Sequence, residues 1–225
     1  MKKALVLFLL ILSGLGVSAL PARAQQDQQQ VVNTALTTLE RMKKDKNFQK
    51  DFQPRLNAAK GALIVPTLFK AGFILGGQYG NGVLLVRRAD GSWSYPAFYT
   101  MSGGSLGLQI GAAGSSILFI IMTDKGLQAM MNDQFKFGAD AGVTFFVVGA
   151  GIGGSSTSAM GADILAFALS GVGLYGGVSL EGTSVAPRES WNAAYYGQNV
   201  AAKGIVLDGQ VSNPNADALR EILSR

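Results

Sequence analysis

The feature that most constrains the fold is the glycine-rich stretch at residues 60–111. Its apolar runs are short, and glycine pairs or Asn-Gly and Asp-Gly steps separate them. Short apolar runs bounded by turn residues are typical of strands rather than helices. Asn81-Gly82 and Asp90-Gly91 predict hairpin turns, because the favoured two-residue turn needs positive φ at both central positions. We therefore expect a glycine-rich antiparallel meander on which the remaining chain packs.

Beyond this stretch, strands outnumber helices and do not alternate with them regularly. Apolar patterns and turn residues predict further strands at residues 105–111, 117–122, 135–149, 162–169 and 172–180. Apolar spacing and capping residues predict helices at residues 31–46, 124–132 and 190–196 and after Asn213-Pro214. This order predicts an α+β fold with a strongly curved antiparallel sheet and a few peripheral helices, because glycine recurs inside the strands.

The amino-terminal residues predict export. Residues 1–24 contain two lysines, an apolar run and the small-residue ending Ala22-Arg23-Ala24, which together are typical of a signal peptide. An uncleaved anchor helix is the alternative interpretation. Cleavage before Gln25 would leave a glutamine-rich leader, residues 25–30, which we expect to be disordered. Residues 31–225 then form a single domain, in a periplasmic or secreted protein without a cysteine for lipid attachment.

Charge does not point to a nucleic-acid partner. The chain has 19 Lys and Arg residues against 14 Asp and Glu. Loss of Lys2, Lys3 and Arg23 with the signal peptide leaves 16 against 14, a net charge of +2. A balance this small demands no polyanionic partner, and part of the high isoelectric point belongs to the exported segment.

Two glycine motifs resemble catalytic or cofactor sites. Residues 149–154 match the dinucleotide-binding pattern, but no helical period follows them, so we expect no nucleotide cofactor. Residues 103–107 match the turn that carries the nucleophile of serine hydrolases. The chain has no histidine to act as a base, and a serine–lysine pair is left open. We interpret residues 103–107 as a tight glycine turn.

Three carboxylates lie within apolar or glycine-rich segments, namely Asp140, Asp163 and Glu181. A buried charge is costly unless it is paired, so these groups need partners. They could converge on a hard cation such as calcium, or form ion pairs and backbone hydrogen bonds. A transition-metal site is not expected, because the chain lacks cysteine and histidine.

Several separated blocks of the chain resemble the SYLF domain family. The blocks, in order, are AKGALIVP (59–66), KAGF (70–73), GGQYGNGV (76–83), WSYPAF (93–98), SLGLQIG (105–111), GAD (138–140), ADI (162–164), GLYGGVSLEG (173–182) and YYG (195–197). The chain departs from the family pattern after Val143, where residues 145–148 run into a Gly/Ser loop. The resemblance implies a non-enzymatic lipid-binding module: eukaryotic members bind phosphoinositides and some bind actin, whereas bacterial members are secreted and stand alone.

We therefore expect binding of anionic phospholipids or of a membrane surface, with phosphatidylglycerol or cardiolipin as candidate lipids. Cations at strand ends and turns are the candidate headgroup ligands: Lys60, Lys70, Arg87, Arg88, Lys125 and Lys136. A membrane-facing basic end of the first helix would add Lys43, Lys44 and Lys46. Each of these cations could equally be solvated. Acyl contacts could come from Phe69, Phe73, Trp93 and Phe98, which could equally be core residues.

A second hypothesis is a structural or protein-interaction module of the cell envelope that has no lipid ligand. In that case the sheet and the loop at residues 151–161 would form the docking surface for an envelope protein. Binding to vesicles separates the two hypotheses.

Overall fold

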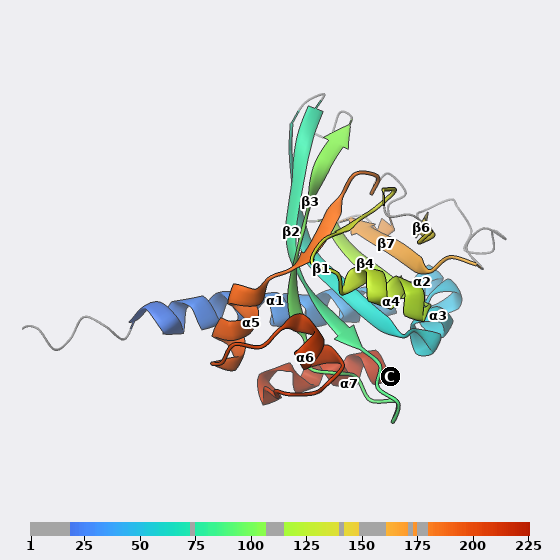
Figure 1. Ribbon diagram of the computed structural model, residues 1–225. Coiled ribbons are helices and arrows are strands. Elements are labelled where there is room, and N and C mark those ends of the chain that lie inside the picture. The colour runs from blue at the N-terminus through green and yellow to red at the C-terminus, as the bar shows by residue number, and fades with distance from the viewer. Residues whose placement is uncertain are drawn as a thin grey trace, which may run out of the picture.

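The structure is a computed structural model that describes residues 19–72, 75–106, 115–139, 142–148, 161–170, 173–174 and 180–225 (Figure 1). Its centre is one sheet with the strand order β5-β9-β3-β2-β1-β4-β7-β6, and β8 also pairs with β7. The strands are β1 (Gly61–Gly72), β2 (Leu75–Val86), β3 (Ala97–Leu106), β4 (Ser115–Ile121), β5 (Phe135–Lys136), β6 (Phe145–Val148), β7 (Ile164–Ser170), β8 (Gly173–Leu174) and β9 (Ser184–Pro187).

Helices pack on both faces of the sheet. They are α1 (Ala19–Lys44), α2 (Lys46–Asp51), α3 (Gln53–Ala58), α4 (Asp124–Met130), α5 (Glu189–Tyr196), α6 (Ala202–Val206), the short 3-10 helix η2 (Pro214–Ala216) and α7 (Asp217–Ser224). The sheet is strongly curved, and β6–β7 is the parallel pair among otherwise antiparallel described pairs (Figure 1). The predicted α+β class with a curved, mainly antiparallel sheet is confirmed.

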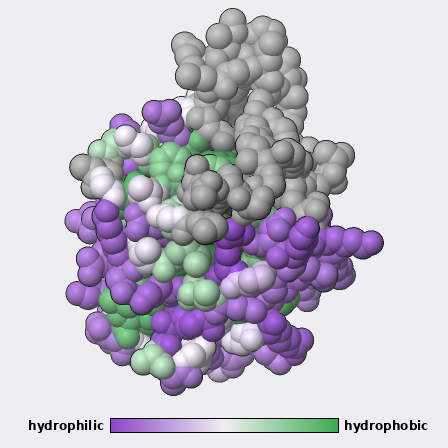
Figure 2. Space-filling view, turned by 90° about the vertical axis from the view of Figure 1, so that its right-hand side faces the viewer, coloured by the Kyte–Doolittle hydropathy of each residue, from purple (hydrophilic) through white to green (hydrophobic). Residues whose placement is uncertain are grey.

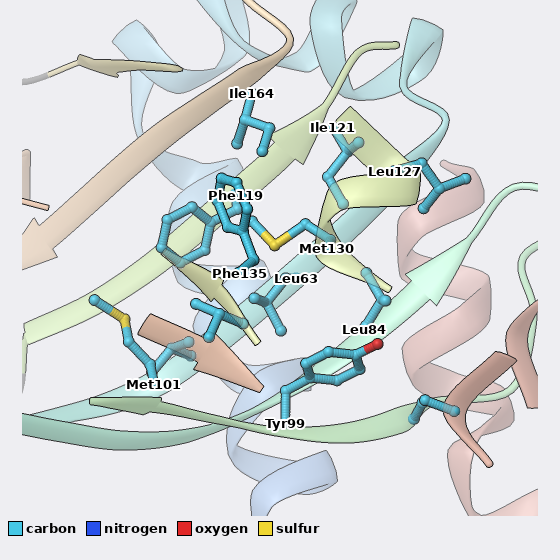
Figure 3. Packing of buried hydrophobic residues seen from close by; sticks show 14 of the residues in the cluster. Leu63, Leu84, Tyr99, Met101, Phe119, Ile121, Leu127, Met130, Phe135 and Ile164 are labelled. Atoms are coloured by element: carbon cyan, nitrogen blue, oxygen red, sulfur yellow. The ribbon is translucent and has the colours of Figure 1, made fainter. Parts of the chain in front are cut away.

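Two apolar layers lie on opposite faces of the sheet, because successive strand residues point to opposite sides. In β1, Leu63 and Val65 face the first core, which α4 and α6 cover. Figure 3 shows this layer, where Leu63 and Phe119 lie near Met130 of α4. The intervening Ile64 faces the second core, which α1, α2, α3 and α7 cover. The middle of β1 is thus packed on both faces.

The first helix is longer than its predicted span. The predicted stripe of apolar residues at 31–46 is confirmed, since Val32, Leu39 and Met42 are buried on one face of α1. The prediction of a disordered leader at residues 25–30 is wrong: these residues are helical, and Gln28 is only 1% exposed. Gln29 accepts a hydrogen bond of 3.1 Å from the Tyr195 hydroxyl, a contact that local composition does not reveal. The predicted signal sequence falls mostly on residues 1–18, which lie outside the described residues.

One of the two predicted hairpin turns is confirmed and the other is wrong. At Asp90-Gly91 the chain turns, Gly91 has a φ of 82°, and the Asp90 carboxylate accepts from the Ser92 amide. Asn81-Gly82 instead lies inside β2, where Asn81 pairs with both neighbouring strands and Gly82 pairs with β3. A Cβ on Gly82 would sit 2.5 Å from the carbonyl oxygen of Ile64, so close backbone approach requires this glycine.

The other predicted elements have mixed outcomes. Thr123 caps α4 and left-handed Gly197 ends α5, as predicted. The expected turn at residues 103–107 is wrong, because residues 103–106 continue β3. The expected long strand at 135–149 is two short ones, β5 and β6, and neither β9 nor α6 was predicted. Residues 107–114, 149–160 and 175–179, which carry several predicted features, lie outside the described residues.

On the side shown in Figure 2, hydrophobic residues form separate patches between hydrophilic ones, as on most protein surfaces. Among the described helices, none is both long and apolar enough to cross a membrane.

Candidate ligand-binding groove

The ends of β1, β2 and β3 extend beyond the two cores and form a projecting ribbon (Figure 1, top). We define this projecting ribbon as residues 69–72, 75–80 and 102–106. β1 pairs with β4 only as far as Leu68, whereas its pairing with β2 continues to Gly72. The ribbon is rich in glycine, and a Cβ on Gly77 or Gly104 would meet nothing within 4 Å. The face of the ribbon that carries Gly77 and Gly104 therefore lacks cover, whereas Thr183 covers the opposite face at Gln78 and Gly103.

Two aromatic side chains are exposed on the projecting ribbon. Phe69 of β1 and Tyr79 of β2 are direct partners in the antiparallel register. They are 61% and 42% exposed, and with Leu207 they are the exposed large hydrophobic residues of the described chain. Directly opposed residues lie side by side on one face of a sheet. The pair therefore forms a small aromatic surface that neither core uses.

A bulge in β1 creates a groove beside this aromatic pair. Pro66 has no amide hydrogen, so it cannot donate to a neighbouring strand. The register of β1 shifts around it, against β2 between Ile64 and Thr67 and against β4 between Val65 and Leu68. The bulge faces α1, and between them lies the α1–β1 groove.

The α1–β1 groove consists of two adjoining hollows of about 270 and 360 Å³. They share Thr34, Pro66 and Thr67. The first hollow is also lined by Asp27, Gln30, Val31, Phe69, Asn81 and Trp191, and the second by Thr37, Thr38, Arg41 and Ser116. The first is therefore partly aromatic, whereas the residues that line the second are four threonines, one serine, one arginine and one proline.

Arg41 lies at the hydroxyl-rich end of the groove. Its Nη2 donates a hydrogen bond of 3.2 Å to the Ser116 hydroxyl, which itself donates at 2.8 Å to the Pro66 carbonyl. The carbonyl of the bulged residue therefore fixes Ser116, and Ser116 fixes one side of the guanidinium. Arg41 belongs to none of the three ion pairs found among the described residues.

Arg188 lies at the aromatic end. Its Nη1 donates at 2.9 Å to the Asn81 side-chain oxygen and at 3.4 Å to the Tyr79 hydroxyl. Its guanidinium carbon lies 3.7 Å from the centre of the Trp191 ring, which is a cation–π contact. Arg188 is likewise absent from the ion pairs of the described chain. The cation Arg41 thus lines one hollow and the cation Arg188 contacts Asn81 and Trp191 of the other, and the observed partners of both are neutral.

The cations predicted from the sequence lie elsewhere. Lys60 forms an ion pair of 3.0 Å with Asp124. Arg87 donates to the carbonyls of Leu56, Ala59 and Gly91, and burial lowers its pKa. Its guanidinium also lies 4.5 Å from the Trp93 ring centre. Arg87 therefore holds the end of α3 against β2, a role that consumes most of its donors.

The remaining predicted cations do not converge on one site in the described chain. Lys60 and Lys70 flank a stretch of β1 about ten residues long, so they are separated by roughly 30 Å; the Lys70 side chain is not among those described. The others are dispersed over the fold: Lys125 donates to the Gly142 carbonyl, Arg88 packs against Gly209, and Lys136 is exposed on β5. Lys44 at the end of α1 and Lys46 at the start of α2 are exposed, and burial together with the charge of Arg225 lowers the pKa of Lys43.

Of the three carboxylates, Asp163 has ordinary hydrogen-bond partners. Asp163 accepts from the Thr123 hydroxyl at 2.6 Å and from the Thr144 amide and hydroxyl at 2.8 and 2.9 Å. Glu181 is exposed, and Asp140 lies outside the described residues. Within the described part of the chain, no group of three or more potential metal-ligating side chains is present.

Sequence reasoning missed Arg41, Arg188, Thr38 and Tyr79. Of the aromatic candidates, Phe69 is exposed as a ligand contact requires, while Trp93 and Phe98 are core residues. Phe73 lies outside the described residues. One signal could have led to the groove: a proline inside an apolar strand run indicates a bulge.

Comparison with known proteins agrees with the resemblance noted above. The model of the Ysc84 family, described as "Las17-binding protein actin regulator", matches residues 102–225. LAS seventeen-binding protein 3 of Saccharomyces cerevisiae is 32% identical over 171 residues, which cover 75% of this chain and 37% of the yeast protein. SH3 domain-containing YSC84-like protein 1 of Mus musculus is 32% identical over 168 residues, which cover 74% of this chain and 48% of the mouse protein. This chain thus spans less than half the length of either relative, and it belongs to the Ysc84 family, whose domain is the SYLF domain.

Proposed function

We propose that this chain binds, without catalysing a reaction, membrane surfaces that contain anionic phospholipids, and that it does so through the projecting ribbon. The observation that supports this most directly is the exposed aromatic pair of Phe69 and Tyr79, with Arg188 beside it. Aromatic side chains gain free energy at the boundary between water and lipid, where the ring is apolar and a hydroxyl stays wet. The pair is therefore a suitable membrane contact.

A nearby cation adds attraction for an anionic lipid. Each Lys or Arg close to an anionic surface contributes about 1 kcal/mol. Arg188 is suited to this because its observed partners are neutral, so no carboxylate competes for its charge in the described chain. The sequence-derived ligands at Lys60, Lys70 and the end of α1 stay predictions. Export by residues 1–24 is also a prediction, and it would place the membrane in the cell envelope.

A protein partner is the second candidate function. It is favoured by the description of the family, whose name refers to binding of the protein Las17. The same aromatic pair could contact an apolar surface on a protein. The two functions differ in whether the chain binds lipid vesicles in the absence of any other protein.

Co-sedimentation of the full chain with vesicles tests the proposal. Vesicles of phosphatidylcholine with added phosphatidylglycerol should pellet the protein, pure phosphatidylcholine should pellet less, and added salt should weaken the binding. The double variant Phe69→Ser, Tyr79→Ser should lose about tenfold or more in affinity, because two interfacial rings are removed.

Leu207→Ser is the matched control. Leu207 is also an exposed hydrophobic residue, at 39%, but it follows α6 and is not part of the projecting ribbon. It should bind vesicles like the unmodified chain. Indifference of the unmodified chain to all vesicles would favour the protein partner. Equal binding by the double variant and the control would remove the ribbon from the proposal.

A further inference from the structure

We propose that the Arg41 end of the α1–β1 groove is an oxyanion site that receives a phosphate group. The site is made of Arg41, Thr38, Thr67 and Ser116. Its ligand is a phosphomonoester or phosphodiester, carried either by a lipid headgroup or by a small water-soluble molecule. The lipid form of this inference rests on the proposed function, whereas the phosphate chemistry does not.

The first argument is the state of the Arg41 guanidinium. A guanidinium has five N–H donors arranged in a fork that matches the oxygens of phosphate or carboxylate. In the described chain Arg41 uses one donor group, Nη2, on the neutral hydroxyl of Ser116. The contact orients the side chain toward the groove without neutralising its charge. An oxyanion would complete the arrangement with charge-assisted hydrogen bonds, which are stronger than neutral ones.

The second argument is the set of hydroxyl groups that face the same hollow. Thr38 is 3% exposed as a residue and lines the hollow with Arg41, and the half-buried Thr67 lines it from β1. Neither hydroxyl oxygen is among the buried polar atoms that lack a partner in the described chain, so both hydroxyls are open to the hollow rather than sealed in the core. A hydroxyl can donate one hydrogen bond, and a ligand oxygen in the hollow would accept from these groups.

The third argument is the distribution of charge and apolar surface along the groove. None of the seven residues lining the Arg41 hollow is acidic, whereas Asp27 lines the other hollow. That other hollow also contains Val31, Phe69 and Trp191. A phosphate would therefore bind at the Arg41 end, and the less polar part of its carrier would lie toward the projecting ribbon.

The fold builds this site through the bulge at Pro66. In the β1–β4 ladder the register passes from Val65 opposite Ile117 to Leu68 opposite Ser115, so the bulge faces Ser116. The Pro66 carbonyl accepts a hydrogen bond from the Ser116 hydroxyl at this bulge. A break in regular pairing thus supplies the anchor for Arg41.

Binding of soluble phosphates to the full chain tests the inference. The probes are inorganic phosphate, glycerol 3-phosphate and a short-chain phosphatidylglycerol used below its micelle concentration, with affinity measured by calorimetry. At least one probe should bind the unmodified chain. Arg41→Gln should weaken its binding at least tenfold, and Thr38→Val should weaken it several-fold while preserving side-chain shape.

Lys44→Gln is the matched control, because Lys44 is an exposed cation on the same helix and does not line the groove. It should bind the probe like the unmodified chain. Melting temperatures of all variants show whether each remains folded. No binding of any probe at millimolar concentration, or equal loss in Arg41→Gln and Lys44→Gln, overturns the inference.

The same measurements distinguish a lipid headgroup from a soluble phosphate, and they test the ribbon proposal and the oxyanion-site proposal independently. Similar affinity for glycerol 3-phosphate and short-chain phosphatidylglycerol identifies a small soluble ligand, whereas a clear preference for the lipid identifies a headgroup. The double variant at Phe69 and Tyr79 should keep its affinity for inorganic phosphate, which has no carrier to reach Phe69, even where it no longer pellets with vesicles. The ribbon can therefore fail its test while the oxyanion site passes, and the reverse also holds.

Discussion

Gly82 shows how a single residue can be needed for space rather than for backbone conformation. It is not among the glycines with positive φ in the described chain, and it lies in the middle of β2. A Cβ there would approach the Ile64 carbonyl oxygen to 2.5 Å, because the bulge at Pro66 pushes β1 toward β2. An Asn-Gly step indicates a turn only when the glycine is needed for a positive φ. The sequence alone does not distinguish that need from a lack of room for a Cβ.

Substitution of Gly82 by alanine should therefore destabilise the fold by about 2 kcal/mol or more, the cost typical of overpacking. The backbone carbonyl that the new methyl group meets cannot move aside without disturbing the ladder. Gly77→Ala is the control, since a Cβ there meets nothing within 4 Å. It should be neutral or slightly stabilising. Urea unfolding curves measure both, and equal stability of the two variants would contradict the argument.

Of the residues that the sequence suggested for a ligand site, Phe69 is the one that lines the groove in the described chain. Arg87 follows a strand in the sequence, as a headgroup ligand would, but its donors go to carbonyls of α3 and of the Gly91 turn. Arg41 is the opposite case. In the sequence it is one of several cations near the end of a helix. It lines the groove only because α1 packs over the β1 bulge, which lies 25 positions further along the chain. Neither outcome is encoded locally.

Among the elements, α4 and β7 are joined by one carboxylate. Asp163 precedes β7 and accepts a hydrogen bond from Thr123, whose hydroxyl also accepts from the Gly126 amide and so caps α4. Burial would raise the pKa of Asp163, but the hydrogen bonds from Thr123 and Thr144, aided by the charge of Lys125, keep it below its usual range. The ionised carboxylate therefore stabilises the junction between helix and sheet.

This junction predicts a pH dependence of stability. A pKa that folding lowers gives stability that is present above the unfolded pKa, near 4, and lost as pH falls through the folded value. Asp163→Asn should cost about 2 kcal/mol at pH 7, because charged hydrogen bonds are replaced by weaker ones. The difference between the variant and the unmodified chain should shrink toward pH 3. Thermal melts across pH 3–7 measure this, and a difference independent of pH would contradict it.

Elements with local signals were predicted well, and those that depend on distant partners were not. The cap at Thr123 and the left-handed stop at Gly197 are read from neighbouring residues, so α4 and α5 were found. β9 is a strand only because it lies between β3 and β5, and its sequence contains a proline. Residues 25–30 are polar enough to look disordered, yet their hydrogen bonds to α5 and to the region of η2 fix them in α1.

At the scale of the whole molecule, the sequence predicted the class of fold and the family but not how the surface is used. Hydrophobic pattern and glycine content are enough for a curved sheet with peripheral helices, because burial of apolar residues decides both. The convergence of α1, the β1 bulge and α5 around one groove depends on how these elements pack. Export remains a prediction, since residues 1–18 lie outside the described chain.

The alternation along β1 has a thermodynamic consequence. Leu63 and Ile64 are adjacent, but each is fully buried in a different apolar layer. Neither layer can melt alone, because the strand that lines one also lines the other, so unfolding should be all-or-none. Leu63→Ala and Ile64→Ala should each cost about 2–5 kcal/mol. Calorimetry should record one heat-absorption peak for each variant, shifted to lower temperature, and two resolved peaks would show that the layers are independent.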